Sequence, residues 1–362
     1  MVRLLDIARE AGVSVMTVSR VLSDSPAIST ATKTRVRAIA ERLGYVPDVM
    51  ARSLRTQSTL LLGAVVTSLT DPVFGPALRA VEEQAQEKGY DLLVAQSQGD
   101  VGREDACIRR MLGRRVEGLF LGPAGRLTPS APVYEDLRRR GSRVVLLGAE
   151  PAFARGFIHV GVDEAAGSHA LTRHLLSLGH RRIAFFAGPV AWAGSQARFE
   201  GYRRALREAG LDIDDRLVFR AGIEAADGAR TLARLWQERT EATAIQAVND
   251  LVAAGVVAEL RQRGCRVPED VSVVGFGDLI LPELAPVPLT TVWQPKHRFG
   301  EAAMELMAAW LRGQVPVSRL LAADLVVRAI AAAPPSALTA SAPAAATQRE
   351  LSTASAGVRQ MA

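Results

Sequence analysis

The chain has 362 residues, of which 48% are hydrophobic, and a formal net charge of +6. This length exceeds one ordinary hydrophobic core, so we expect several domains. No extended apolar run suggests a membrane span, and Cys107 and Cys265 are too few for a disulfide framework or a metal cage. The first residues show no charged-then-apolar leader, and we therefore expect a cytoplasmic protein.

The first 46 residues predict three short helices that share one small core. Residues 5–11 have apolar side chains at helical spacing, Gly12 suits the positive φ of a tight turn, and Ser14 is a good N-cap for a second helix. Ser29 can cap a third helix over about 30–43. This arrangement is typical of a helix-turn-helix that binds double-stranded DNA, although generic helical hairpins share the pattern.

The second helix is expected to read the DNA. Val18, Val21 and Leu22 fall on the face toward the first helix. The residues at its start and on its outward side would face base edges and phosphates in the major groove: Ser14, Val15, Met16, Thr17, Ser19 and Arg20. Residues 1–57 hold nine Lys or Arg and five acids, which is +4 of the net +6, so the other residues carry only +2. This basic head predicts binding that weakens as salt rises.

Residues 47–58 predict a linker with one short helix, which is too small to be stable alone and would fold when held by DNA and a partner. From Ser58 onward, buried strands alternate with amphipathic helices, which favours two doubly wound parallel-sheet lobes joined by several crossovers. Lobe one would comprise about 59–160 and 293–319, and lobe two about 161–290 and 320–333. A cleft between them, at the carboxyl ends of strands, would bind a small molecule.

Residues 334–362 are rich in Ala, Ser, Thr and Pro and are expected to be disordered. They contain no Leu heptad that could build a tetramer, so we expect a homodimer whose two heads read a pseudo-palindromic operator.

Several motifs closely resemble the lactose repressor (LacI) family of bacterial transcription regulators. In the head and linker these are Asp6-Ile7-Ala8, Ala11-Gly12-Val13-Ser14, Thr17-Val18-Ser19-Arg20-Val21-Leu22, Leu43-Gly44-Tyr45-Val46-Pro47 and Ala51-Arg52-Ser53-Leu54-Arg55. In the body they are Leu178-Gly179-His180-Arg181-Arg182-Ile183-Ala184, Arg198-Phe199-Glu200-Gly201-Tyr202, Val248-Asn249-Asp250 and the run from Val267 to Phe276. The resemblance covers about 5–328 and implies a sensor domain of the periplasmic-binding-protein-like type.

By this resemblance Val15 and Met16 would read bases, and Arg20 would contact a base or a phosphate. Leu54 from each of two subunits would wedge into the minor groove at the operator centre, with Ala51 and Arg55 beside it. Two residues depart from the family pattern. Arg3 stands where a capping Thr or Ser is usual, and Asp48 replaces the usual hinge Asn and puts a negative charge near phosphate.

The same resemblance assigns an effector site. Arg198 would fork onto hydroxyls or carboxylates, and Asn249 could donate and accept hydrogen bonds. Asp71 and Phe74 would line the cleft from lobe one, with a helix cap and core packing as their plain structural alternatives. Asp278, the acid that remains in the Gly275-Phe276-Gly277-Asp278 run, completes the expected set.

The class of effector is inferred from missing carboxylates. Many relatives have an acid where this chain has Gly277, and Gly148-Ala149-Glu150 also lacks an Asp often found there. With Arg198 retained, this favours an anionic ligand. The runs Val15-Met16-Thr17-Val18-Ser19-Arg20 and 68–74 are similar to the gluconate-type branch, so we expect a sugar acid such as gluconate or a ketogluconate. If Gly277 is only a loop variant, a neutral sugar or a nucleobase fits instead.

No catalytic, metal or cofactor site is expected. His169, His174 and His180 do not share one helical face, the Gly275-Phe276-Gly277 run lacks the third glycine of a dinucleotide fingerprint, and a cleft alone does not imply an enzyme. We expect a repressor that releases its operator when the effector binds. The same residues also permit a corepressor, and control by a protein partner is a further alternative.

Overall fold

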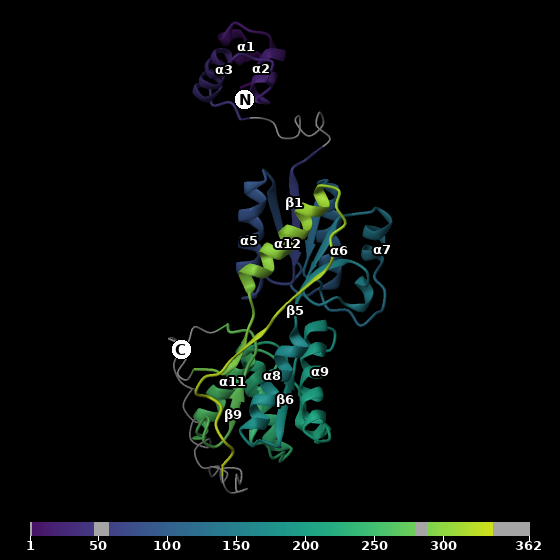
Figure 1. The fold of residues 1–362 in the computed structure, drawn as a ribbon, viewed down its shortest axis with the longest axis vertical. Coiled ribbons are helices and arrows are strands. Elements are labelled where there is room, and N and C mark those ends of the chain that lie inside the picture. Colours follow the sequence, from purple (N-terminus) through teal and green to yellow (C-terminus); the bar gives the residue numbers. More distant parts are fainter. Residues whose placement is uncertain (1, 47–57, 280–287, 336–362) are drawn as a thin grey trace, which may run out of the picture. The chain divides into compact units, whose positions relative to one another are not determined.

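The computed structural model describes residues 2–46, 58–279 and 288–335, and the chain forms two compact units that divide after Leu60 (Figure 1). The helices and strands of these residues confirm the predicted architecture: a three-helix head, and a body with two parallel-sheet lobes. None of the helices in this described part is both long and apolar enough to cross a membrane.

The head consists of α1 (Leu4–Ala11), α2 (Val15–Leu22) and α3 (Thr30–Arg42). Gly12 has a φ of 63° at the turn between α1 and α2, and the Ser14 hydroxyl accepts a 3.1 Å hydrogen bond from the Thr17 amide. A single small core holds the three helices together, with the fully buried side chains Ile7, Val18, Val21 and Val36 at its centre. The Asp6 carboxylate accepts from the Arg3 amide at 2.9 Å, so the start of α1 is capped without the Thr or Ser that Arg3 replaces.

The first lobe contains a six-stranded sheet in the order β11-β5-β4-β3-β1-β2, and every pair in it is parallel. Its strands are β1 (Leu61–Val66), β2 (Asp91–Gln96), β3 (Gly118–Leu121), β4 (Val144–Leu147), β5 (Ile158–Val162) and β11 (Arg319–Leu321). Helices α5 (Phe74–Glu87) and α12 (Lys296–Leu311) pack on one face of the sheet. Helices α6 (Val101–Gly113) and α7 (Pro132–Arg139) cover the other face, next to the short η1 (Ala152–Ala154).

The second lobe contains a parallel sheet in the order β7-β6-β8-β9. Its strands are β6 (Ile183–Ala187), β7 (Val218–Arg220), β8 (Ala244–Ala247) and β9 (Ser272–Val274), with η2 (Asp215–Leu217) before β7. Helices α10 (Ala225–Gln237) and α11 (Asp250–Gln262) pack on one face, and α8 (Glu164–Ser177) and α9 (Ala193–Glu208) on the other.

Within the described residues, three segments carry the chain between the lobes, and Figure 1 shows them running between the two sheets. They lead from β5 into α8, from β10 (Thr291–Trp293) into α12, and from β11 into β12 (Asp324–Val326). Strands β10 and β12 pair antiparallel. The first and third crossovers are joined by a 2.9 Å hydrogen bond from the Asp163 amide to the Leu321 carbonyl.

One expectation about the strands is wrong. The sequence predicts that the chain returns to lobe two at Leu320. In the structure, β11 pairs with β5 and so extends the first lobe's sheet. The cause is that β5 leaves an unpaired edge next to the place where the chain returns from α12. The chain crosses to the second lobe only after Leu321, and Ile330 then enters that lobe's core.

Candidate DNA interface and effector site

The start of α2 presents an apolar surface to solvent. Val15 is 39% exposed and Met16 is 63% exposed, although every apolar residue of the opposite face of this helix is buried or half-buried. Arg20 follows Met16 by four residues and is exposed on the same side. The Ser14 hydroxyl is engaged in the cap and lies 2.9 Å from that of Thr17. This surface can contact thymine methyl groups, with one cation a helical turn away for a guanine or a phosphate.

Other cations of the head are held by acids. Asp24 pairs with Lys33 at 3.0 Å and Arg37 at 2.7 Å, and Glu10 pairs with Arg42. Lys33, which has the larger effect, and Arg37 lower the pKa of Asp24. These pairs fasten α3 to the preceding segments, so they contribute to the fold of the head as well as to its surface charge.

Arg198 is the centre of the second candidate site. It lies in α9, which begins at Ala193, and only 4% of the residue is exposed. Its guanidinium donates from Nε to the Glu164 carboxylate and from Nη1 to the Val248 carbonyl. The carbon Cζ lies 3.8 Å from the ring centre of Phe276 and 5.2 Å from that of Trp192. The cation is thus held between two aromatic rings and one carboxylate.

Glu164 connects this arginine to the crossovers. Its second oxygen, Oε1, accepts a 3.2 Å hydrogen bond from Nε2 of Gln294. Glu164 stands at the start of α8, directly after the first crossover, whereas Gln294 stands on the second. Arg198, Glu164 and Gln294 therefore form one chain of polar contacts from the interior of lobe two to the segments that connect the lobes.

Comparisons with known proteins identify the family. Residues 3–48 match the model of the lacI family of bacterial regulatory proteins, and 172–329 match the periplasmic binding protein-like domain. The HTH-type transcriptional regulator DegA of Bacillus subtilis is 30% identical over 90% of this chain and 96% of its own length. The ribose operon repressor of Escherichia coli is 32% identical over 85% of this chain and 92% of its own length. The chain belongs to the LacI family.

A solved structure agrees with this assignment. The lac repressor dimer bound to operator and the anti-inducer ONPF has a TM-score of 0.82 and 26% identity, covering 92% of this chain and 99% of that one. The LacI-family chain is accordingly a DNA-binding transcriptional regulator, and the exposed start of α2 stands where its DNA interface is expected.

Asn249 and Phe74, two further predicted effector residues of this LacI-family regulator, make contacts that support the fold. Asn249 caps α11, because its Oδ1 accepts from the Val252 amide at 2.8 Å, and its Nδ2 donates to the Ile223 carbonyl at 2.8 Å. Phe74 packs at the edge of the first lobe's core. These contacts match the plain alternatives of capping and core packing, and a ligand would have to use the free lone pairs or faces that remain.

The two predicted acids of the effector site, Asp71 and Asp278, have different surroundings. Asp71 accepts from the Val73 amide at 2.9 Å, and burial raises the pKa of its carboxyl while the Arg198 charge opposes this rise. Asp278 is bound by Arg328 at 2.8 Å and has a φ of 48°. Asp71 thus lies within electrostatic range of Arg198, whereas Asp278 already has a cationic partner.

Gly277 has a conformational reason for being glycine. Its φ is 127°, a region that residues with a side chain rarely adopt, and its amide donates to the Val292 carbonyl at 2.8 Å. An added Cβ would lie 2.8 Å from the Leu279 side chain. The absence of a carboxylate here therefore follows from the backbone, and it carries less information about the ligand than the sequence alone suggests.

Sequence reasoning did not single out Glu164, Trp192 or Gln294. The available signal for Glu164 was its place after the carboxyl end of a parallel strand, where polar side chains often face ligands. The expected hinge residues Asp48, Ala51, Leu54 and Arg55, and the tail from 336 onward, lie outside the described residues.

Proposed function

We propose that this chain is a repressor that binds a pseudo-palindromic operator as a homodimer and releases it when a small metabolite binds between the lobes. The DNA-binding part of this proposal is supported by the family and by the exposed Val15, Met16 and Arg20 at the start of α2. Ser19 would lie on the same surface, and Leu54 with its neighbours Ala51 and Arg55 would kink the operator centre.

The observation that carries the effector response is the contact chain Arg198–Glu164–Gln294. A ligand that takes hydrogen bonds from Arg198 competes with Glu164, and Glu164 in turn holds Gln294 on a crossover. Binding would therefore favour one arrangement of the crossovers over another, which is what a shift between two conformations requires. A coupling of about 1–3 kcal/mol between ligand and operator would be typical.

We further propose a sugar acid, such as gluconate or a ketogluconate, as the effector. A specific observation favours a second candidate, a neutral sugar: Arg198 already has a carboxylate partner in Glu164, so its charge does not by itself require an anionic ligand. The name of one relative, the ribose operon repressor, also favours the neutral class.

A two-stage experiment tests the function. Operator sites are first selected from random duplexes with the full-length protein, and their binding is measured by fluorescence anisotropy. Sugar acids, neutral sugars, phosphorylated sugars and purines are then screened by thermal shift, and each hit is titrated into the protein–operator complex. A hit that stabilises the protein and releases DNA supports an inducer. Tighter DNA binding indicates a corepressor, and failure to select any palindromic site contradicts the proposed function.

A further inference from the structure

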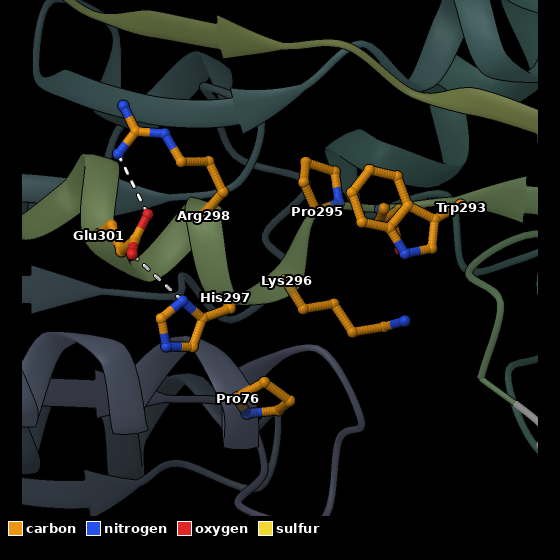
Figure 2. A pocket seen from close by; sticks show the side chains of 8 residues that line it. Pro76, Trp293, Pro295, Lys296, His297, Arg298 and Glu301 are labelled. Atoms are coloured by element: carbon orange, nitrogen blue, oxygen red, sulfur yellow. Dashed lines mark hydrogen bonds and ion pairs between the residues drawn. The ribbon is translucent and has the colours of Figure 1, made fainter.

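A pocket of about 410 Å³ is connected to the Arg198–Glu164 pair through Gln294, which lines the pocket and donates to Glu164. Residues 293–298 and Glu301 line it from one side and Pro76, near the start of α5, from the other. Gln294 belongs both to this lining and to the contact with Glu164. Figure 2 shows the Lys296 side chain extending from the start of α12 into the open space that Pro76 and Trp293 border.

Lys296 differs from the other cations of this region. Its Nζ donates to the backbone carbonyl of Asp278 at 3.1 Å, and none of the ion pairs among the described residues includes it. The nearby carboxylates have other partners: that of Asp278 binds Arg328, and that of Asp250 accepts from the Thr291 hydroxyl and the Leu279 amide.

Burial acts on this lysine as well. Desolvation lowers the pKa of Lys296, although the charges of Asp278 and Asp250 act in the opposite direction. An ammonium group that has lost part of its water and has no ion pair gains from an anion placed beside it. By contrast, the Arg298 guanidinium in the same lining lies 2.5 Å from Glu305 and 3.3 Å from Glu301.

Trp293 adds an apolar surface to the pocket. It is 42% exposed, although the neighbouring Val292 is fully buried. The face of an indole ring can cover the carbon–hydrogen side of a sugar chain. Hydroxyl groups on the other side could reach Gln294, which bonds to Glu164.

We propose that Lys296 forms the anion-binding end of the effector site and that the site therefore selects carboxylated sugars over neutral ones. This inference rests on the proposed function, because it assumes that the effector binds at the Arg198 site. Lys296, and not Arg198, would bind the carboxylate of the ligand, because Glu164 already neutralises the Arg198 charge. Arg198, Glu164 and Gln294 would then serve the hydroxyl groups.

Calorimetric titration of the full-length protein tests this proposal with a matched pair of ligands. D-gluconate and D-glucitol share a six-carbon hydroxylated chain and differ in that the first has a terminal carboxylate. We also include 2-ketogluconate and galacturonate. We expect at least one of the acids to bind the wild type tenfold or more tightly than D-glucitol. Lys296→Met should remove at least tenfold of that affinity, whereas Lys296→Arg should retain most of it.

Arg298→Met is the matched control, because it removes a cation from the same lining that already has carboxylate partners. Its acid affinity should stay within about twofold of wild type. Equal loss in both methionine variants, an unchanged affinity in Lys296→Met, or no acid bound by the wild type would each overturn the assignment. If Lys296→Met fails to fold, the Lys296→Arg variant and the wild-type preference still test the proposal, because a wild type that binds D-glucitol as tightly as the acids overturns it. Operator binding without ligand is measured in parallel, since its absence would contradict the regulator function instead.

Discussion

Gln294 and Glu164, which are 130 residues apart, are joined by a 3.2 Å hydrogen bond that links two of the crossovers between the lobes. The other oxygen of the same carboxylate is bound to Arg198. One acid therefore shares its hydrogen bonds between a proposed ligand-binding residue and a segment that carries the chain from lobe to lobe.

Removing Arg198 should cost stability as well as ligand response. Arg198→Met leaves Glu164 as an uncompensated charge in a site where both side chains are largely buried, and loss of one partner of such a pair costs about 3–5 kcal/mol. The double variant Arg198→Met/Glu164→Gln should recover part of that loss. Urea unfolding of wild type, both single variants and the double variant measures the coupling, and strictly additive effects would show that the pair does not interact.

Substitutions at Val18 and Met16 should have different effects. The first should lower the stability of the head, and the second should change the DNA sequence that it prefers. Val18 is fully buried, so Val18→Ala should lower the stability of the head by about 2 kcal/mol. Met16 is mostly exposed, so Met16→Ala should leave stability unchanged and alter the preferred bases of the half-site. Thermal melting of the head and binding-site selection measure the two effects. If Met16→Ala selects the same DNA site as the wild type, Met16 does not contribute to base recognition.

Leu54→Ala should weaken specific operator binding far more than binding to unrelated duplex. A wedge at the operator centre contributes only where the DNA is kinked to receive it. Anisotropy titrations on the selected operator and on a scrambled duplex of equal length give the two affinities. Equal weakening on both would mean that Leu54 contributes no sequence-specific contact.

His180 should make the stability of the body depend on pH. It is 1% exposed, and its ring contacts the hydroxyls of Thr243 and Ser272 and the carbonyl of Ala332. Burial lowers the pKa of His180 below its ordinary value of 6.5. Below pH 6.5 the unfolded chain therefore takes up a proton that the folded one resists, and stability should fall as pH decreases through that value.

The measurement for this prediction is the urea midpoint between pH 5 and pH 8, with His180→Gln as the comparison. The variant should be less stable at neutral pH and should show a shallower decline toward acid. His174, whose pKa burial also lowers, should contribute to the decline that remains. An identical pH profile in both proteins would assign the effect to other groups.

Gly277→Ala should destabilise the body by about 1–3 kcal/mol, because its φ of 127° is unfavourable for a residue with a Cβ. Gly313→Ala, which also changes a glycine with positive φ but has open space around its Cβ position, is a suitable comparison. The Gly277 variant should lose more stability in urea unfolding, since the Leu279 side chain must also move. A smaller loss than in the Gly313 variant would contradict this account.

Most of the fold could be predicted because it follows from local patterns. Buried strand runs such as 61–66 and the turn at Gly12 depend on residues that are neighbours in sequence. The Arg198–Glu164 pair could not be predicted in this way, because it requires the relative register of α8 and α9 across a packed interface. The pairing of β11 with β5 was missed for a similar reason, since a three-residue strand contains too little pattern to choose between two sheets.

The candidate site shows the same division. Arg198 was recognisable from its motif, whereas Glu164, which forms an ion pair with it, was not. Asn249 and Asp71 were recognisable as polar residues at the ends of strands and loops. Their hydrogen bonds to nearby backbone amides, however, depend on the exact start of the helix or turn that follows them.

The backbone at Gly277 also limits how this regulator could be turned into a sensor for another metabolite. Introducing an aspartate there, to add a carboxylate to the expected effector site, would place a side chain on a backbone conformation that disfavours one. The substitution would lower the stability of the engineered protein whether or not the new carboxylate contacted a ligand. Redesign of specificity is therefore better begun at Lys296 and Trp293, whose side chains already border open space.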